Sequence, residues 1–484
     1  MRRTKIVCTI GPASNKRGVI ESLISAGMNV ARLNFSHGTH EQHGAVIADL
    51  RDVSRRMGRP LAILQDLSGP KVRLGNFKAE SFLLKRGQEV GFVPELLEGG
   101  AETHRHSSGA LLLPLPITEL LAEVRIGNTL LLDDGKIPLK VVRLEGDPYA
   151  PNRIVWTKCV AGGEIRQRKG VTVPGADLSI PAVTDKDKDD LRFGLAQGVD
   201  WVAASYVRTA EDLAVIKQIM DEAGIHRPII AKIEKAEAVK NLDKILKVVD
   251  GIMVARGDLG VEMPFDEVPL VQKMIIKRCN QAGKPVITAT QMLESMITTP
   301  RPTRAEATDV ANAILDGTDA VMLSGETAMG LFPVLAVRTM ARIALRTESV
   351  IFDEESYLAR FKPAVSTTEA VARAATEIAL QIKASAIICA TTSGGTARRV
   401  AQYRPSVPIL GITCEAATYR QLALSWGVRP YLMKPVNSTE ELLAVTRSIA
   451  LEAKVAAKGD KVVLTAGVPV NNPGTTNLIE VHTL

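Results

Sequence analysis

Two stretches of the sequence decide how this chain folds: Ile229–Glu234, which reads Ile-Ile-Ala-Lys-Ile-Glu, and Met253–Asp258, which reads Met-Val-Ala-Arg-Gly-Asp. Each is an apolar, partly β-branched run that ends in charged residues, which is typical of a buried strand with a polar C-terminal end. Because side chains alternate along a strand, Lys232 and Glu234 point to the same face. Two interpretations are open: a structural ion pair at a strand end, or a cation beside carboxylates that bind a divalent metal.

The same kind of short apolar segment occurs eight times, with amphipathic helical stretches such as Asp212–Ala223 and Val268–Gln281 in between. Strands that alternate with helices predict a parallel sheet, and eight of them predict a closed (β/α)₈ TIM barrel. The functional residues of such a barrel lie at the C-terminal ends of its strands. The predicted strands are Ile6–Ile10, Asn29–Phe35, Leu61–Leu67, Trp201–Val207, Ile229–Glu234, Gly251–Arg256, Pro285–Gln291 and Ala320–Ser324.

The connection between the third and fourth predicted strands is far too long for a loop. Residues 71–179 contain short alternating segments with Gly and Asp turns, so we expect an inserted all-β domain there. Residues 1–70 and 180–350 then form the barrel, close to the ~250 residues that are typical of one. Residues 351–484 again alternate strands with helices, which predicts a C-terminal αβα sandwich. The strands expected in these two domains are Val90–Val93, Thr129–Leu132, Ile137–Leu144, Ile154–Val160, Ala386–Ala390, Val407–Thr413 and Lys461–Ala466.

The composition, with 46% hydrophobic and 23% charged residues, is that of an ordinary globular protein. The formal net charge of +7 comes from basic residues interspersed with acidic ones, so it does not indicate a nucleic-acid surface. No apolar run in the sequence reaches the ~18 residues of a membrane span, and the N-terminus does not read as a secretion signal. The five cysteines are scattered, as in a reduced protein, so we expect a cytoplasmic location without membrane partners.

Polar residues follow nearly every predicted barrel strand, whereas the strands themselves are apolar. Glu234 and Asp258 are hard oxygen ligands on consecutive strands, and they suit Mg²⁺ or Mn²⁺. Lys232 is a flexible cation able to follow a phosphoryl group. Gly257 and Gly260 let backbone N–H groups approach a carboxylate closely. The polar residues at the strand ends are Arg32, Asn34, Ser36, Asp66, Ser205, Lys232, Glu234, Asp258, Thr290, Ser324 and Glu326.

Seven motifs resemble those of pyruvate kinases, bacterial in style, and together the resemblance covers nearly the whole chain. They are Thr4–Ser14, Met28–Gly38, Ala231–Glu234, Asp250–Pro264, Ile287–Met296, Pro300–Asn312 and Val321–Gly330. The resemblance implies a glycolytic enzyme that transfers the phosphoryl group of phosphoenolpyruvate to ADP and then protonates the enolate to pyruvate. It also implies a homotetramer, and a mobile lid formed by the inserted domain that closes over the barrel mouth and excludes water.

The resemblance also implies roles for individual residues. The catalytic residues would be Lys232, Thr290, Arg32 and Ser324, with Thr290, Ser324 and water forming a proton relay in which no single acid is named. The residues that hold Mg²⁺ or Mn²⁺ would be Glu234 and Asp258. Phosphoenolpyruvate would contact Arg32, Lys232, Arg256, Gly257, Asp258 and Thr290. The nucleotide would contact Asn34, His37, Arg73 and Lys169.

One segment departs from the family's pattern. Residues 65–73 read Gln-Asp-Leu-Ser-Gly-Pro-Lys-Val-Arg, with Leu67 where relatives that need K⁺ carry Thr and Lys71 where they carry Glu. Because a lysine ammonium is itself a monovalent cation, we expect Lys71 to take the place of K⁺. Activity should then not require K⁺, and the ion pocket would be vestigial; its residues are Asn34, Ser36, Asp66 and Leu67. The alternative is an exposed lysine at the lid hinge with no such role.

The C-terminal domain contains a second candidate site. Residues 391–396 read Thr-Thr-Ser-Gly-Gly-Thr and lie between a predicted strand and the predicted helix Ala397–Tyr403. Hydroxyls and free N–H groups at the start of a helix form a cradle for phosphate, although an ordinary Gly-rich turn is the alternative. The resemblance implies an allosteric effector, a sugar phosphate or AMP, bound by Thr391, Thr392, Ser393, Gly394, Gly395 and Thr396.

Two other functions are compatible with parts of the sequence. The first is another metal-dependent barrel that acts on phosphoenolpyruvate or pyruvate, such as an aldolase-like lyase, but such an enzyme needs no lid over a nucleotide. The second is a non-catalytic protein that senses a sugar phosphate through residues 391–396. That protein would have no need of Lys232, Glu234, Asp258 and Thr290, all of which are present.

Overall fold

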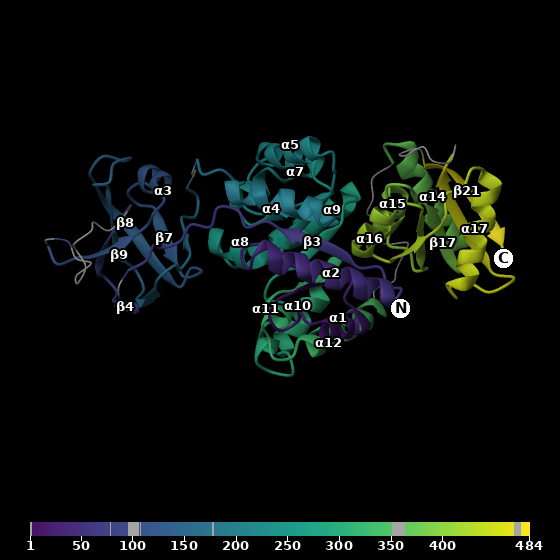
Figure 1. The fold of residues 1–484 in the computed structure, drawn as a ribbon, viewed down its shortest axis with the longest axis horizontal. Helices are drawn as coiled ribbons and strands as arrows, with labels where there is room; N and C mark the ends of the chain where they lie inside the picture. Colours follow the sequence, from purple (N-terminus) through teal and green to yellow (C-terminus); the bar gives the residue numbers. More distant parts are fainter. Residues whose placement is uncertain are drawn as a thin grey trace.

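A computed structural model describes residues 2–77, 79–94, 106, 108–176, 179–350, 364–468 and 476–484. Three units lie in a row: the inserted domain at one end, the barrel in the middle and the C-terminal domain at the other end (Figure 1). Within the described ranges, no helix combines the length and the apolar character needed to cross a membrane. The predicted limits at residues 71, 180 and 351 remain predictions, and residues 351–363 lie outside the described ranges.

The barrel is a closed sheet of eight parallel strands in the order β1-β16-β15-β14-β13-β12-β3-β2. Each of the eight predicted segments contains one of these strands, which confirms the predicted fold. Most predicted segments extend one to three residues beyond the observed strand at its C-terminal end, where the polar residues begin. The strands are β1 (Lys5–Thr9), β2 (Val30–Asn34), β3 (Ala62–Asp66), β12 (Trp201–Ala204), β13 (Ile229–Ile233), β14 (Gly251–Ala255), β15 (Val286–Ala289) and β16 (Ala320–Leu323).

The barrel strands are buried on both faces, which explains their continuous apolar sequences. One face of the strands fills the barrel interior, with residues such as Val7, Ile230 and Met253, and the other face packs against the surrounding helices. Ala423 and Leu424 belong to the same interior cluster, although they come from the C-terminal domain. These two residues close the N-terminal end of the barrel.

The helices around the barrel begin at clear capping residues. Thr39, Thr184 and Thr303 each form a capping box with the residue three positions later, at the starts of α2, α4 and α10. The predicted helix at 268–281 is confirmed as α9, and the one at 212–223 is a short 3₁₀ turn followed by α5. The helices are α1 (Arg17–Ala26), α2 (His40–Arg56), α4 (Asp185–Ala196), α5 (Ala214–Ala223), α6 (Ala236–Lys240), α7 (Leu242–Val248), α8 (Arg256–Glu262), α9 (Val268–Ala282), α10 (Arg304–Leu315), α11 (Gly325–Ala328) and α12 (Pro333–Glu348).

The inserted domain consists mostly of β-strands, with one short helix, α3 (Thr118–Glu123). Its strands form a six-stranded sheet in the order β11-β7-β8-β9-β5-β6 and a two-stranded ribbon of β4 and β10. A core of Leu and Val side chains lies between these elements. The strands are β4 (Ser81–Leu84), β5 (Glu89–Val93), β6 (Leu111–Pro114), β7 (Thr129–Leu132), β8 (Ile137–Glu145), β9 (Ile154–Cys159), β10 (Gly163–Arg166) and β11 (Val171–Thr172).

The C-terminal domain is a five-stranded sheet in the order β19-β18-β17-β20-β21, with helices on both faces. Helices α14 (Thr367–Gln381) and α15 (Gly395–Gln402) cover one face, and α17 (Thr439–Glu452) covers the other. The predicted αβα sandwich is therefore confirmed. The remaining elements are α16 (Ala416–Gln421), η3 (Leu422–Leu424), β17 (Ala386–Ala390), β18 (Ile409–Thr413), β19 (Val428–Leu432), β20 (Lys461–Gly467) and β21 (Thr476–Thr483).

Candidate active site

The C-terminal ends of the barrel strands open into a cleft of about 250 Å³ between the barrel and the inserted domain. The barrel side carries most of the carboxylates and the inserted domain carries most of the cations. Such a cleft suits an anionic ligand that is held together with a metal ion. Its charged and polar lining residues are Tyr206, Glu234, Lys235, Asp258 and Glu262 from the barrel, with Lys71, Arg73, Asp133, Asp134, Arg168 and Lys169 from the inserted domain.

Lys232, near the end of β13, lies at the centre of a cluster of buried polar groups. Its Nζ lies 2.7 Å from Glu234 Oε1, 3.3 Å from Asp66 Oδ1 and 2.7 Å from Ser205 Oγ. Lys232 and Glu234 therefore share one face, as strand alternation predicts. The ion pair between Lys232 and Glu234 that the sequence allowed is present. It lies at the end of the barrel where a cation beside metal-binding carboxylates was also expected.

The charges of this cluster stabilise one another. Burial alone would lower the pKa of Lys232, but Asp66 and Glu234 outweigh it and raise that pKa. Burial alone would raise the pKa of Asp66, but Lys232 and Arg32 hold it below its usual value of 3.8. The pKa of Glu234 is raised by burial and by the neighbouring Asp258 carboxylate, in spite of Lys232. Because a divalent cation relieves this strain between Glu234 and Asp258, the two carboxylates fit Mg²⁺ or Mn²⁺.

Arg32, on β2, is fixed by the same cluster. Its Nε donates to Asp66 Oδ2 at 2.6 Å, and its Nη1 donates to Thr9 Oγ1 at 2.9 Å. The side chain is 11% exposed, so the guanidinium is held in place before any ligand arrives. This arrangement presents a rigid cation beside Lys232, as contact with a phosphate requires.

Thr290, immediately after β15, has a strained backbone with a φ of 66°, which is unusual for a β-branched residue. Its Oγ1 accepts a hydrogen bond from the Gly257 N–H at 2.8 Å and donates one to Ala289 O at 2.7 Å. Arg256 Nη2 donates to Thr290 O at 2.7 Å, and Arg256 also pairs with Asp309. Both the Thr290 hydroxyl and the Gly257 N–H are therefore already engaged in hydrogen bonds within the protein.

Glu326 links Ser324 to the loop that begins at Thr290. The Ser324 N–H donates to Glu326 Oε2 at 2.7 Å, and the Leu293 N–H donates to Glu326 Oε1 at 3.0 Å. Leu293 follows Thr290 by three residues, so one buried carboxylate joins the loops after β15 and β16. Glu326 is fully buried, and its two hydrogen bonds hold these loops together.

Comparisons with known proteins agree along the whole chain. The family profile "Pyruvate kinase, barrel domain" matches residues 1–337, and "Pyruvate kinase, alpha/beta domain" matches residues 369–482. A pyruvate kinase of Geobacillus stearothermophilus is 47% identical over 485 residues, covering 100% of this chain and 80% of that protein. The chain belongs to the pyruvate kinase family.

Two further relatives support this membership. A pyruvate kinase of Sporosarcina psychrophila is 46% identical over 487 residues, covering 100% of this chain and 81% of that protein. The crystal structure of a pyruvate kinase from Cryptosporidium parvum aligns with a TM-score of 0.91 at 36% identity, covering 100% of this chain and 96% of the other.

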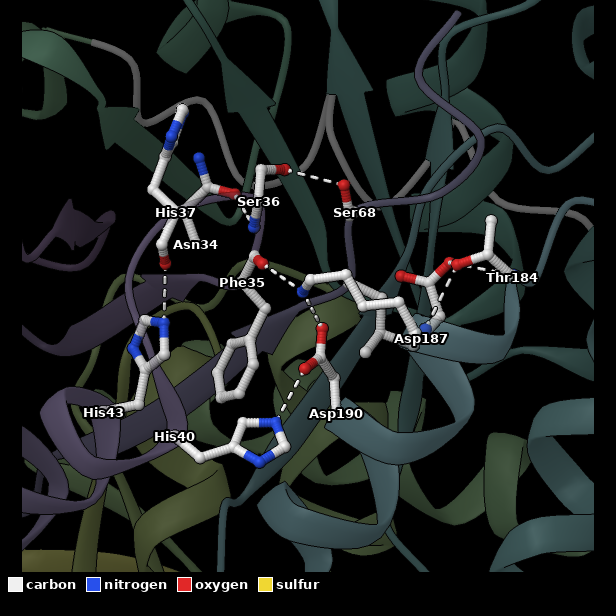
Figure 2. A network of polar contacts seen from close by, with 12 residues as sticks. Asn34, Phe35, Ser36, His37, His40, His43, Ser68, Thr184, Asp187 and Asp190 are labelled. Carbon is white, nitrogen blue, oxygen red and sulfur yellow. Dashed lines mark hydrogen bonds and ion pairs between the residues drawn. The ribbon is translucent and has the colours of Figure 1, made fainter. Parts of the chain in front are cut away.

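The residues that are predicted to contact the nucleotide come from the barrel and from the inserted domain. Asn34 ends β2 and His37 follows it, and Asn34 Oδ1 accepts a hydrogen bond from the Ser36 N–H at 3.2 Å (Figure 2). Arg73 and Lys169 belong to the inserted domain, where Lys169 Nζ lies 2.6 Å from Asp133 Oδ1. Burial lowers the pKa of His37, and the cations Lys71, Arg73 and Arg32 lower it further.

The oxygen atoms of the predicted ion pocket already take part in hydrogen bonds and ion pairs within the protein. Asp66 binds Arg32 and Lys232, Leu67 O accepts the Ser205 hydroxyl at 2.6 Å, and Ser36 Oγ donates to Ser68 Oγ at 3.2 Å. Lys71 lies nearby on the cleft wall. Desolvation and Lys232 lower the pKa of Lys71, whereas Asp258 and Glu234 act in the opposite direction.

The predicted effector turn lies in the C-terminal domain, between β17 and α15. Gly394 has a φ of 82°, and its N–H donates to Thr391 Oγ1 at 2.9 Å. The Thr392 carbonyl accepts from Thr418 Oγ1 at 2.7 Å. Thr396 is buried and its hydroxyl lies 2.7 Å from that of Thr476, whereas Ser393 is exposed. Four of the six predicted residues therefore lie on the turn, and Gly395 and Thr396 begin α15.

Sequence reasoning missed Tyr206 as a residue of this pyruvate kinase cleft. Its φ is 55°, its N–H donates to Glu234 Oε2 at 2.7 Å, and its ring lines the cleft. Burial and the carboxylates of Glu234 and Asp258 raise the pKa of its hydroxyl. The predicted strand Trp201–Val207 contains this residue, whereas β12 ends at Ala204. The polar Ser205 in an otherwise apolar run is the signal that marks where the strand stops.

Proposed function

We propose that this chain transfers the phosphoryl group of phosphoenolpyruvate to ADP, giving pyruvate and ATP. The observation that carries the proposal is the buried cluster of Lys232, Asp66, Arg32 and Glu234, which faces Asp258 at the mouth of the barrel. The cluster supplies two fixed cations and a pair of metal-binding carboxylates in one place. Membership of the pyruvate kinase family over the whole chain supports the same reaction.

The residues of the barrel act on phosphoenolpyruvate in this proposal. Arg32 and Lys232 bind the phosphoryl group, and Lys232 follows it because a flexible ammonium tracks the moving charge. The backbone of 256–258, together with Thr290, binds the carboxylate. Glu234 and Asp258 hold Mg²⁺ or Mn²⁺, which neutralises charge on the phosphoryl oxygens when it is bound. Thr290 and Ser324 take part in the proton relay to the enolate.

The inserted domain acts as a lid in this proposal. Arg73 and Lys169 lie on it, and Asn34 and His37 lie on the barrel side. Closure brings the two sets together around ADP and excludes water, which would otherwise capture the phosphoryl group.

A direct assay tests the reaction. Pyruvate formation, coupled to lactate dehydrogenase, should require ADP, phosphoenolpyruvate and Mg²⁺ or Mn²⁺, and chelation of the metal by EDTA should abolish it. An aldolase-like lyase, in contrast, would release pyruvate from a carbon–carbon cleavage substrate without ADP. Pyruvate formation that is independent of ADP would overturn the proposed function.

We also propose that activity does not require K⁺. Lys71 shares the electrostatic surroundings of Lys232, Glu234 and Asp258, and protein donors already engage the oxygens of the former ion pocket. Activity in a buffer whose only monovalent cation is tetramethylammonium should equal activity with added K⁺. Lys71→Glu should become K⁺-activated, because the added carboxylate needs a cation to balance it. Strong activation of the unmodified chain by K⁺ would contradict the proposal that Lys71 takes the place of this ion.

Finally, we propose a phosphorylated allosteric effector, a homotetramer and a cytoplasmic location. The turn at 391–396 supports the effector, because it joins a strand end to the start of α15 and exposes Ser393. Calorimetric titration of the whole chain with sugar phosphates and with AMP tests this site. No binding at millimolar concentrations by the chain, or equal binding by a Ser393→Glu variant, would remove the proposal.

A further inference from the structure

The lid leaves the barrel after Gly69 and returns to it before α4, and both connections meet at one carboxylate. Asp187 lies in the first turn of α4 and is 1% exposed. Its Oδ1 accepts a hydrogen bond from the Gly69 N–H at 3.1 Å. Its Oδ2 accepts hydrogen bonds from the Thr184 N–H at 2.9 Å and the Thr184 hydroxyl at 2.6 Å (Figure 2). A single side chain therefore joins Gly69, two residues before the lid, to Thr184, five residues after it.

Gly69 needs such a bond to keep one conformation. Its φ is 65°, and a Cβ at this position would lie 2.6 Å from the Tyr206 ring. Glycine is the residue that fits, but it is also the residue with the greatest backbone freedom. The hydrogen bond to Asp187 selects one conformation and keeps Gly69 packed on Tyr206, whose own N–H donates to Glu234. Gly69, where the chain leaves the barrel for the lid, is thus held in position relative to Glu234, a predicted metal ligand.

The same turn of α4 also fixes the loop after β2. Lys186 Nζ donates to Phe35 O at 2.8 Å and to Asp190 Oδ2 at 2.6 Å. Asp190 Oδ1 in turn lies 2.8 Å from His40 Nε2 (Figure 2). The start of α4 therefore holds both lid connections and the loop that carries Asn34 and His37 in one rigid frame.

We propose that Asp187 is a positioning residue that pins both ends of the lid hinge, so that closure delivers Arg73 and Lys169 to the nucleotide. This role rests on the proposed function, because it assumes that the lid closes over ADP. The residues assigned to phosphoenolpyruvate lie on the barrel and do not depend on the hinge. Loss of the hydrogen bonds to Asp187 should therefore raise the KM for ADP and leave the KM for phosphoenolpyruvate unchanged.

Asp187→Asn is the decisive variant, because it keeps the shape of the side chain but has only one acceptor oxygen. The amide nitrogen must face either the Gly69 N–H or the Thr184 N–H, so one of the two connections is lost. We expect about tenfold faster hydrogen exchange at whichever of the Gly69 and Thr184 amides loses its acceptor, and about a tenfold higher KM for ADP, because one hydrogen bond is lost. Thr184→Ala removes the hydroxyl contact with Asp187 Oδ2 and the N-cap bond from the Asp187 N–H, but it keeps both backbone N–H bonds to the carboxylate and should change the same two quantities less.

Glu441→Gln is the matched control, because Glu441 also lies in the first turn of a helix, α17, and accepts the Asn437 N–H at 3.0 Å. It contacts no part of the hinge and should leave exchange at Gly69 and both KM values unchanged. Equal changes in the two KM values, or unchanged exchange at both the Gly69 and the Thr184 amides, would overturn the role of Asp187. Thr184→Ala alone decides by the same criteria if Asp187→Asn does not fold. If the unmodified chain forms no pyruvate in an ADP-dependent way, the proposed function is wrong. Hydrogen exchange at the Gly69 and Thr184 amides would still test whether Asp187 holds the two lid connections.

Discussion

At the scale of single residues, the candidate site depends on charges that are buried together. Lys232, Asp66 and Arg32 are each 12% exposed or less in their side chains, and each would be costly to bury alone. Their mutual contacts offset the cost of burial, and they hold Lys232 at the place where a phosphoryl group would move. The contacts that position Lys232 for the proposed reaction are therefore the same contacts that stabilise the buried charges.

Lys232→Met should preserve the fold and abolish most phosphoryl transfer. Removal of one preorganised charge at the reacting group lowers kcat by about 10²–10³. The measurement is the coupled pyruvate assay, with circular dichroism as the check on folding. Lys217→Met, on the exposed face of α5, removes the same charge far from the cleft and should keep full activity. Retained turnover in Lys232→Met would count against the proposed mechanism.

Asp66→Asn should weaken the fold and change its response to acid. The pKa of Asp66 is lower in the folded chain than its usual 3.8, so its contribution is fully present above pH 3.8 and is lost as the pH falls through the lower, folded value. Its removal leaves Arg32 and Lys232 short of a partner and should cost about 3–5 kcal/mol at pH 7. Denaturant unfolding at pH 7 and at pH 3 should show a smaller loss on acidification in the variant than in the unmodified chain.

At the scale of elements, the barrel strands were predictable because their apolar runs and polar ends are written in consecutive residues. Two strands of the C-terminal sheet were missed for a physical reason. β19 (Val428–Leu432) contains Pro430, which argues against a strand, but β19 lies at the edge of the sheet, where proline is tolerated. β21 runs antiparallel to β20 at the other edge, outside the alternating pattern of strand and helix.

The candidate site was predictable only in part. Lys232, Glu234 and Asp258 stand out because charge interrupts an apolar run, whereas Asp187 looks like one of many charges in a polar helix start. Its role depends on Gly69, which is 118 residues away in the sequence. Contacts across such a distance arise from the closure of the barrel, and no local pattern encodes them.

The end of α15 anchors the C-terminal domain on the barrel through Arg404. Its guanidinium lies 2.9 Å from Asp319 Oδ1 and donates to Asn280 Oδ1 at 2.9 Å, and both charged side chains are buried. Arg404→Leu leaves the Asp319 charge buried and should cost about 3–5 kcal/mol of stability.

The control for this change is Arg373→Leu, which breaks the partly exposed pair with Glu377 on α14 and should cost about 0.5 kcal/mol. Denaturant unfolding of the two variants compares them directly. Equal losses would show that the Arg404 contact contributes no more than a surface pair.

At the scale of the whole molecule, the barrel carries apolar side chains that a single chain leaves in water. Phe265 and Leu270, beside and within the start of α9, are 84% and 69% exposed. Large apolar side chains that are this exposed and lie five residues apart in the sequence support the proposed homotetramer.

The double variant Phe265→Glu/Leu270→Glu should therefore reduce the oligomer to smaller species, which light scattering coupled to size-exclusion chromatography will measure. Leu83→Glu, at an equally exposed position of the lid, is the control and should leave the assembly unchanged. An unchanged mass of the double variant would place the interface elsewhere.

The two residues that close the barrel, Ala423 and Leu424, have a consequence for the order of folding during synthesis. They lie about 100 residues beyond the last barrel strand, and Trp201 within the barrel donates its indole N–H to Gln421 O beside them. A nascent chain that has completed all eight strands still has an open apolar end, which only later residues can seal. We therefore expect the barrel to reach its final packing after the C-terminal domain has left the ribosome, and to need protection from aggregation until then.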